Sequence, residues 1–350
     1  MNIILLSGGS GKRLWPLSND IRSKQFIKIF RNEDGTYESM VQRVYRGICK
    51  ADPEAKITIA TAKSQLSSIF NQLGDGVEVS VEPCRRNTFP AIALATAYLH
   101  DRMGVSPEES VVVCPVDPYV ESSYFEALKT LAAQADKGEA NLVLMGIEPT
   151  YPSEKYGYIM PLTQDEVAQV SSFKEKPKAD KAAEYISQGA LWNGGVFAYK
   201  LRYVLDRSRE LMGTADYQTL FNSYGDLQKI SFDYAVVEHE EKIQVCRYRG
   251  RILAVGLLGV LGTVMGLASS VASKYLIDAV TGYGSEFLVR SAIVMGLMML
   301  GGLVFQGISN RVSAKIHILV RNEMQHNTYT RILRAGWEAL EPYRSGDLLN

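Results

Sequence analysis

A glycine-rich loop near the N-terminus is the first feature that could do chemistry. The stretch Gly8–Arg13 reads Gly-Gly-Ser-Gly-Lys-Arg and follows the apolar run Ile3–Ser7. Because glycine has no side chain, phosphate oxygens can approach the backbone N–H groups of such a loop closely. Arg13 and the nearby Lys24 add two cations, which suit a triphosphate. The loop predicts phosphate binding, and a plain turn between two elements is the alternative interpretation.

Two common nucleotide motifs do not fit this loop. A Walker A motif needs Gly at position 6 and Ser or Thr at position 13, where Leu6 and Arg13 stand. The dinucleotide-binding fingerprint fails on the spacing of its glycines. The phosphate-binding interpretation therefore requires another kind of site.

Strand-length apolar runs alternate with helical patterns over residues 1–245. The apolar runs are Ile3–Ser7, Ile57–Thr61, Val77–Val81, Val111–Val116 and Leu142–Ile147. The helical patterns include Tyr37–Lys50, Thr88–Asp101 and Ser122–Lys137. Strands that are apolar throughout and separated by helices indicate βαβ units buried on both faces. We predict an α/β domain with a mostly parallel sheet over residues 1–245.

Composition excludes several classes of function. The 350 residues carry 38 basic and 38 acidic side chains, so no net positive charge points to nucleic acid. The four cysteines, Cys49, Cys84, Cys114 and Cys246, are scattered, which argues against a disulfide framework or a zinc site and fits a reducing cytoplasm. The N-terminus lacks a charged leader region and reaches glycines after Leu6, so it is not expected to be a signal peptide.

A series of motifs begins with the glycine-rich loop and continues along the chain in a fixed order. They are Gly8–Ser18, Lys24–Phe26, Glu82–Ala93, Val113–Asp117, Gly146–Pro149, Tyr156–Ile159, Phe173–Pro177, Trp192–Phe197 and Ser231–Ala235. Taken together, this order resembles the mannose-1-phosphate guanylyltransferases, a branch of the sugar-phosphate nucleotidyltransferases. The resemblance implies a Rossmann-like nucleotidyltransferase domain that forms GDP-mannose and pyrophosphate from GTP and mannose 1-phosphate.

The resemblance also implies roles for individual residues. Arg13 and Lys24 would be catalytic through their contacts with the phosphates, and Asp117 would bind Mg²⁺. The implied nucleotide-binding residues are Gly8, Gly9, Ser10, Gly11, Glu82, Arg86 and Asn87. The implied sugar-phosphate-binding residues are Tyr156, Gly157, Glu175, Lys176 and Asn193. The alternatives are structural, since Asp117 could cap the following helix and Asn193 could be a turn residue.

Several departures from the family pattern bear on activity. Pro118 stands where the family usually has His, and Lys155 precedes the motif at Tyr156. After Glu238 the family continues to a second metal-binding aspartate, which has no equivalent downstream here. We therefore expect residues 1–245 to bind GTP but to turn over poorly, and to expose a sheet edge that the missing segment would cover.

The last hundred residues follow a different pattern. Residues 252–273 and 291–310 are uncharged runs long enough to cross a bilayer, which takes about 20 apolar residues. Basic residues flank both runs on their outer sides, which predicts a multi-pass cell-membrane protein with residues 1–245 in the cytoplasm. A pair of buried helices in a soluble bundle is the alternative interpretation.

Two motifs stand out in residues 247–350, Tyr275–Val280 after the first uncharged run and Tyr343–Leu349 near the end. On these motifs the region resembles the start of a type I ATP-binding-cassette exporter, which implies an all-α region with a helical hairpin and a long cytoplasmic helix. Three interpretations stay open. The chain is an enzyme anchored by two helices, a fragment of an ATP-driven exporter, or, as we favour, an accidental join of two coding sequences. Expected partners are the lipid bilayer, further transporter helices or a second copy of the chain.

Overall fold

A computed structural model describes residues 1–9, 23–32 and 34–248 of this chain. Contacts divide the chain into two units, Met1–Arg249 and Gly250–Asn350. The second unit, with the predicted spans 252–273 and 291–310 and the exporter-like region, lies outside the described residues. Within the described ranges, no helix combines the length and apolar character that a membrane crossing requires.

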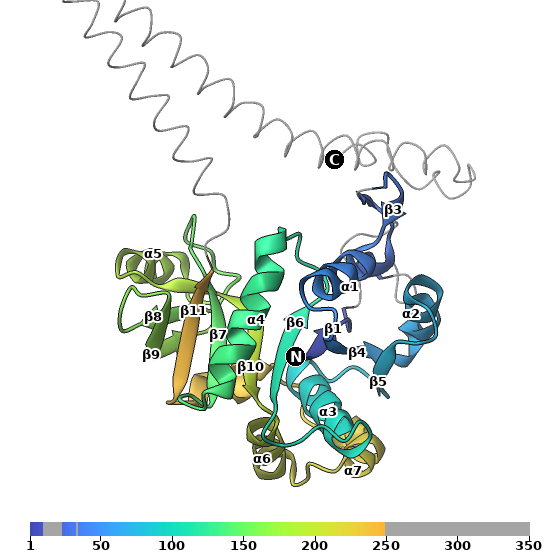
Figure 1. Cartoon of the computed structure of the whole chain (residues 1–350). Coiled ribbons are helices and arrows are strands. Elements are labelled where there is room, and N and C mark those ends of the chain that lie inside the picture. The colour runs from blue at the N-terminus through green and yellow to red at the C-terminus, as the bar shows by residue number, and fades with distance from the viewer. Residues whose placement is uncertain (10–22, 33, 249–350) are drawn as a thin grey trace, which may run out of the picture. The chain divides into compact units, whose positions relative to one another are not determined.

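Nine strands of the described residues form one sheet, in the order β5-β4-β1-β6-β10-β7-β11-β9-β8. In chain order they are β1 (Asn2–Leu6), β4 (Lys56–Ala62), β5 (Glu78–Glu82), β6 (Ser110–Pro115), β7 (Leu142–Ile147), β8 (Tyr158–Pro161), β9 (Val167–Lys174), β10 (Leu191–Lys200) and β11 (Ile243–Tyr248). A separate pair is formed by β2 (Phe30–Arg31) and β3 (Tyr37–Glu38). Figure 1 shows β6 and β10 near the middle of the sheet.

The direction of the strands refines the prediction of a mostly parallel sheet. β5, β4, β1 and β6 run parallel to one another, as expected from βαβ units. β10 is antiparallel to both β6 and β7, and β9 is antiparallel to β11 and β8. The first residues of β10 also pair with β8, so this half of the sheet curls back on itself.

Helices cover both faces of the sheet (Figure 1). The α-helices are α1 (Met40–Ala51), α2 (Leu66–Leu73), α3 (Thr88–Asp101), α4 (Ser122–Asp136), α5 (Ala179–Ser187), α6 (Leu201–Met212), α7 (Tyr217–Ser223) and α8 (Phe232–Ala235). The 3₁₀ turns are η2 (Lys24–Phe26), η3 (Lys63–Gln65), η4 (Tyr224–Asp226) and η5 (Val237–His239). Alternate strand residues face opposite layers. Ile4 packs with the α3 and α6 layer, whereas Ile3 and Leu5 pack with the α1 and α4 layer.

One prediction about local structure was wrong. The helix expected from Tyr37 begins only at Met40, because Ser39 and Gln42 form a reciprocal capping box that starts the helix there. The sheet edge expected from the missing segment stays a prediction, and among the described strands β5 is an edge strand that pairs only with β4. β11 is an interior strand with β7 on one side and β9 on the other.

Candidate active site

The glycine loop leaves the sheet at the carboxyl end of β1. Ser7 continues the ladder by donating its backbone N–H to Ala60 O at 2.8 Å, and Gln25 Nε2 donates to Ser7 O at 2.9 Å. Gly8 has little room for a side chain, because a Cβ there would lie 3.1 Å from Oε1 of Glu82. The predicted site residues Ser10, Gly11 and Arg13 lie outside the described residues.

A buried glutamine holds the two residues that flank the segment 10–22. Gln65 Nε2 donates to Gly9 O at 3.1 Å and to Ser23 Oγ at 2.7 Å. Its Oε1 accepts from Thr61 Oγ1 at 2.9 Å, which fixes the orientation of the amide. Gln65 could not be predicted for this role, because a single glutamine after a strand gives no local signal of it.

Lys24 and Asp117 form an ion pair beside the loop. Lys24 begins η2, and Asp117 lies two residues beyond the end of β6. The pairing of β1 with β6 places Leu6 opposite Pro115, so the loop and Asp117 leave the sheet at the same edge. The two side chains are 36% and 41% exposed, so both charges are accessible to a ligand. The structure thus brings together two residues predicted from separate motifs.

Glu82 ends β5 at this same edge and is buried. Tyr224 OH donates to its Oε2 at 2.9 Å. Burial raises the pKa of the Glu82 carboxyl, which the tyrosine bond and the Arg85 charge partly oppose.

The two other predicted residues of the nucleotide segment differ in their surroundings. Asn87 caps α3, since its Oδ1 accepts from Thr88 N at 2.9 Å, and it adopts a φ of 72°. Its side-chain oxygen therefore has a structural partner already. Arg86 carries a buried Nε that has no hydrogen-bond partner among the described atoms.

A second group of polar side chains gathers where β10 begins. Asn193 Nδ2 donates to Asp233 Oδ1 at 2.7 Å, and Asn193 Oδ1 accepts from Gly195 N at 3.1 Å. The backbone N–H of Asn193 donates to Gly157 O at 2.8 Å. Asn193 thus joins the motifs at 156–159 and 192–197 to Asp233, a residue of the motif Ser231–Ala235 for which no role was predicted.

Glu175 and Lys176 complete this second group. Their side chains form an ion pair, and the Lys176 ammonium lies 5.9 Å from the centre of the Tyr234 ring. Gly157 packs tightly here, because a Cβ on it would approach Glu175 Oε2 to 2.7 Å. Tyr156 lies at the periphery, 42% exposed, with its ring 4.8 Å from that of Trp192.

The reversed direction of β10 brings the second group to the edge that carries the loop. Asn193 lies opposite Gly146 near the carboxyl end of β7, and further along β10 Phe197 lies opposite Val113 of β6. In α/β sheets, ligands bind beyond the carboxyl ends of the parallel strands. Both groups of polar residues therefore occupy the ligand-binding edge of this sheet.

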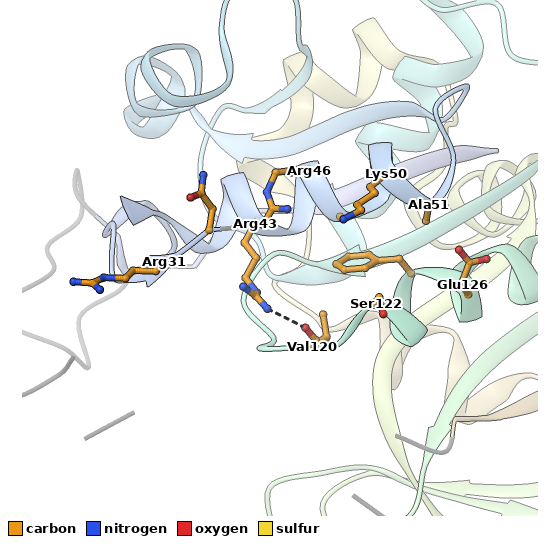
Figure 2. A pocket seen from close by; sticks show the side chains of 11 residues that line it. Arg31, Arg43, Arg46, Lys50, Ala51, Val120, Ser122 and Glu126 are labelled. Atoms are coloured by element: carbon orange, nitrogen blue, oxygen red, sulfur yellow. Dashed lines mark hydrogen bonds between the residues drawn. The ribbon is translucent and has the colours of Figure 1, made fainter. Parts of the chain in front are cut away.

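A cationic hollow beside α1 is separate from these groups (Figure 2). Figure 2 shows Arg43, Arg46 and Lys50 projecting from α1, with Arg43 directed toward the Val120 carbonyl. Arg46 donates two hydrogen bonds to the buried Glu38, at 2.8 and 3.0 Å, and Arg43 lies 3.6 Å from the same carboxylate. No residue predicted for the site lines this hollow.

Asp233 gives the second group a dependence on pH. Burial, with a further contribution from the Glu175 charge, raises the pKa of Asp233 to about 6. The folded chain then holds a proton that the unfolded chain releases, so stability falls as pH rises from about 4 to 6. We expect Asp233→Asn to remove this fall, which is at most about 3 kcal/mol, when the free energy of unfolding is measured against pH.

Asp216→Asn is the matched control for this prediction. Hydrogen bonds from Thr219 lower the pKa of Asp216, so its contribution has the opposite sign. An Asp233→Asn chain whose stability falls as steeply as the parent's between pH 4 and 6 would contradict the assignment.

The fold and these two groups define an α/β protein whose polar side chains gather at the carboxyl edge of its parallel strands. Residues 2–233 match the family model described as Nucleotidyl transferase, and the chain belongs to this family. It is thus similar to enzymes that transfer nucleotidyl groups, and mannose-1-phosphate guanylyltransferases are among its relatives.

Curated relatives match about two thirds of the chain. The xanthan biosynthesis protein XanB of Xanthomonas campestris is 32% identical over 257 residues, which cover 67% of this chain and 53% of that protein. The mannose-1-phosphate guanylyltransferase of Klebsiella pneumoniae is 28% identical, with 67% and 54% covered. The chain spans about half the length of the curated relatives it matches.

A solved structure shares the fold. It is described as a mannose-1-phosphate geranyltransferase from Thermus thermophilus and is 29% identical, with a TM-score of 0.61. The match covers 71% of this chain and 74% of that one. It supports the predicted Rossmann-like nucleotidyltransferase fold.

Proposed function

We propose that this chain transfers a guanylyl group from GTP to mannose 1-phosphate. The products would be GDP-mannose and pyrophosphate. The observation that carries the proposal is the Lys24–Asp117 ion pair, which lies beside the glycine loop at the ends of β1 and β6. The names of several relatives, including the mannose-1-phosphate guanylyltransferase of Klebsiella pneumoniae, support the choice of substrates.

In the proposed reaction a phosphate oxygen of mannose 1-phosphate forms a bond to the α-phosphorus of GTP. The bond from that phosphorus to the oxygen bridging to the β-phosphate breaks, and pyrophosphate leaves with the electron pair. The protein contributes mainly position and charge. The Lys24 ammonium would neutralise phosphate oxygens, and Asn193 and Glu175 would hold the sugar through hydroxyl groups.

A divalent cation fits one position in this arrangement. Within the described residues no cluster of three or more His, Cys, Asp or Glu side chains could hold a metal. Asp117, however, offers one accessible carboxylate at the phosphate edge, and Mg²⁺ commonly takes one or two carboxylates together with substrate phosphates. Asp117 would therefore hold Mg²⁺ with the nucleotide, where the ion would neutralise phosphate charge.

Incubation of the full-length chain with GTP, mannose 1-phosphate and MgCl₂ tests the proposal. We expect slow release of pyrophosphate in equal amount with GDP-mannose, because the described residues offer the cation one carboxylate, Asp117, at the phosphate edge. Matched reactions with UTP or glucose 1-phosphate should be slower still. Absence of GDP-mannose under these conditions would refute the proposed activity.

Membrane attachment and the exporter origin of residues 247–350 stay predictions. They rest on the uncharged runs 252–273 and 291–310 and their basic flanks. The family match ends at residue 233 and does not bear on them. The same holds for the interpretation of the chain as a join of two coding sequences.

A further inference from the structure

A buried hydrogen bond links the end of β5 to a turn 142 residues further along the chain. Tyr224 begins η4 and is completely buried, and its OH donates to Glu82 Oε2 at 2.9 Å. Glu82 is itself only 5% exposed. A buried carboxylate needs hydrogen-bond partners, and a phenol is a strong one because it donates to a charged acceptor.

The two oxygens of Glu82 face different surroundings. Oε2 accepts from Tyr224, whereas Oε1 lies 3.1 Å from the position that a Cβ would take on Gly8. The tyrosine bond therefore turns Oε1 toward the glycine loop. The last side-chain torsion of glutamate has a broad range of preferred angles. Without the tyrosine bond, the Glu82 carboxylate would therefore rotate more freely about that torsion.

An oriented carboxylate distinguishes purine bases. Guanine presents two neighbouring donors, N1–H and the exocyclic N2 amine, to an acceptor at its edge. Adenine presents an unprotonated N1 at the corresponding position, which repels a carboxylate oxygen. A buried polar group left without its partner reduces the binding affinity more than a missing contact at the surface does. Such a site therefore discriminates strongly between guanine and adenine nucleotides.

We propose that Tyr224 is a positioning residue that orients Glu82 and thereby sets the preference for guanine nucleotides. This inference rests on the proposed use of GTP and adds to it a residue that no motif indicated. Tyr224 acts through Glu82, since the tyrosine is completely buried and its hydroxyl donates to that carboxylate.

Tyr199 provides a matched control for removal of a buried hydroxyl. It is also completely buried, in the same core cluster as Tyr224, and its OH forms a 2.9 Å hydrogen bond with Thr96 Oγ1. Tyr199→Phe and Tyr224→Phe each remove one buried hydroxyl that makes a 2.9 Å hydrogen bond, to a neutral hydroxyl for Tyr199 and to a carboxylate for Tyr224. A purely structural role would give the two variants similar effects.

The experiment compares the two variants and the parent as full-length chains. KM and kcat are measured for GTP, and kcat/KM is measured for ITP, which lacks the N2 amine, and for ATP. We expect Tyr224→Phe to raise the KM for GTP about 10-fold with kcat within about twofold, and to lower the GTP/ATP preference by a similar factor. Tyr199→Phe should leave both quantities unchanged.

A direct binding measurement separates this inference from the proposed reaction. Displacement of a fluorescent GTP analogue by GTP, ITP and ATP reports base preference whether or not GDP-mannose is formed. A parent chain that binds GTP selectively but forms no GDP-mannose would overturn only the proposed reaction. An unchanged preference in Tyr224→Phe, or an equal change in Tyr199→Phe, would overturn the role of Tyr224.

Discussion

Asp117→Asn is expected to lower kcat for GDP-mannose formation by about 10²-fold or more, because one side chain serves two electrostatic roles. Its carboxylate pairs with Lys24 in the free chain and is positioned to hold a cation beside the phosphates when the nucleotide binds. Asparagine keeps the size of the side chain and removes its charge. Initial rates at saturating GTP, over a series of MgCl₂ concentrations, measure the effect.

The metal dependence identifies which role dominates. If Asp117 holds the cation, Asp117→Asn should raise the MgCl₂ concentration that gives half-maximal rate, whereas Lys24→Gln should mainly raise the KM for GTP. Glu121→Gln is the control, since Glu121 is an exposed carboxylate four residues away. A rate within about threefold of the parent for Asp117→Asn would exclude Asp117 from the reaction.

Gly47→Ala is expected to destabilise the folded chain by about 2 kcal/mol, although alanine is the better helix former. Gly47 lies inside α1, where a Cβ would meet the Phe125 ring of α4 at 2.2 to 2.8 Å. Phe125 is itself 7% exposed, so its ring cannot move aside without disturbing the packing of α1 on α4. The free energy of unfolding in denaturant measures the loss.

Two further variants test the steric cause. Gly76→Ala adds the same methyl group where no atom lies within 4 Å, so it should change stability by less than about 0.5 kcal/mol. Phe125→Leu combined with Gly47→Ala should recover part of the loss, because the smaller side chain makes room for the Cβ. A Gly47→Ala chain as stable as the parent would show that the two helices separate freely.

Local patterns predicted the elements that depend on nearby residues. The helix Thr88–Asp101 and the strand Leu142–Ile147 have the predicted bounds. Each is an apolar run of the length typical of a buried helix or strand, so the pattern alone indicates where it begins and ends. The start of α1 was missed although Ser39 and Gln42 carry a visible capping signal. The reversed β10 could not be predicted from its composition, since hydropathy has no direction along a strand.

The candidate site was predictable in part, for a similar reason. Lys24, Asp117, Glu175 and Asn193 lie in ordered motifs, and the structure places them at one edge of the sheet. The contacts that orient the site join residues far apart in the chain. The hydrogen bonds from Tyr224 to Glu82 and from Asn193 to Asp233 form only when the sheet brings these residues together. The spacing of residues within a single motif cannot predict such long-range contacts.

The place of β10 in the sheet also affects how the chain can fold during synthesis. β6 leaves the ribosome well before β10, which is one of its two neighbours in the sheet. β7 likewise leaves before both of its neighbours, β10 and β11. Sheets that depend on such non-local pairs form slowly and expose strand edges meanwhile. A nascent chain that stops before Leu191 therefore has an open edge at Val111–Val113, where association with a chaperone or with another nascent chain competes with folding.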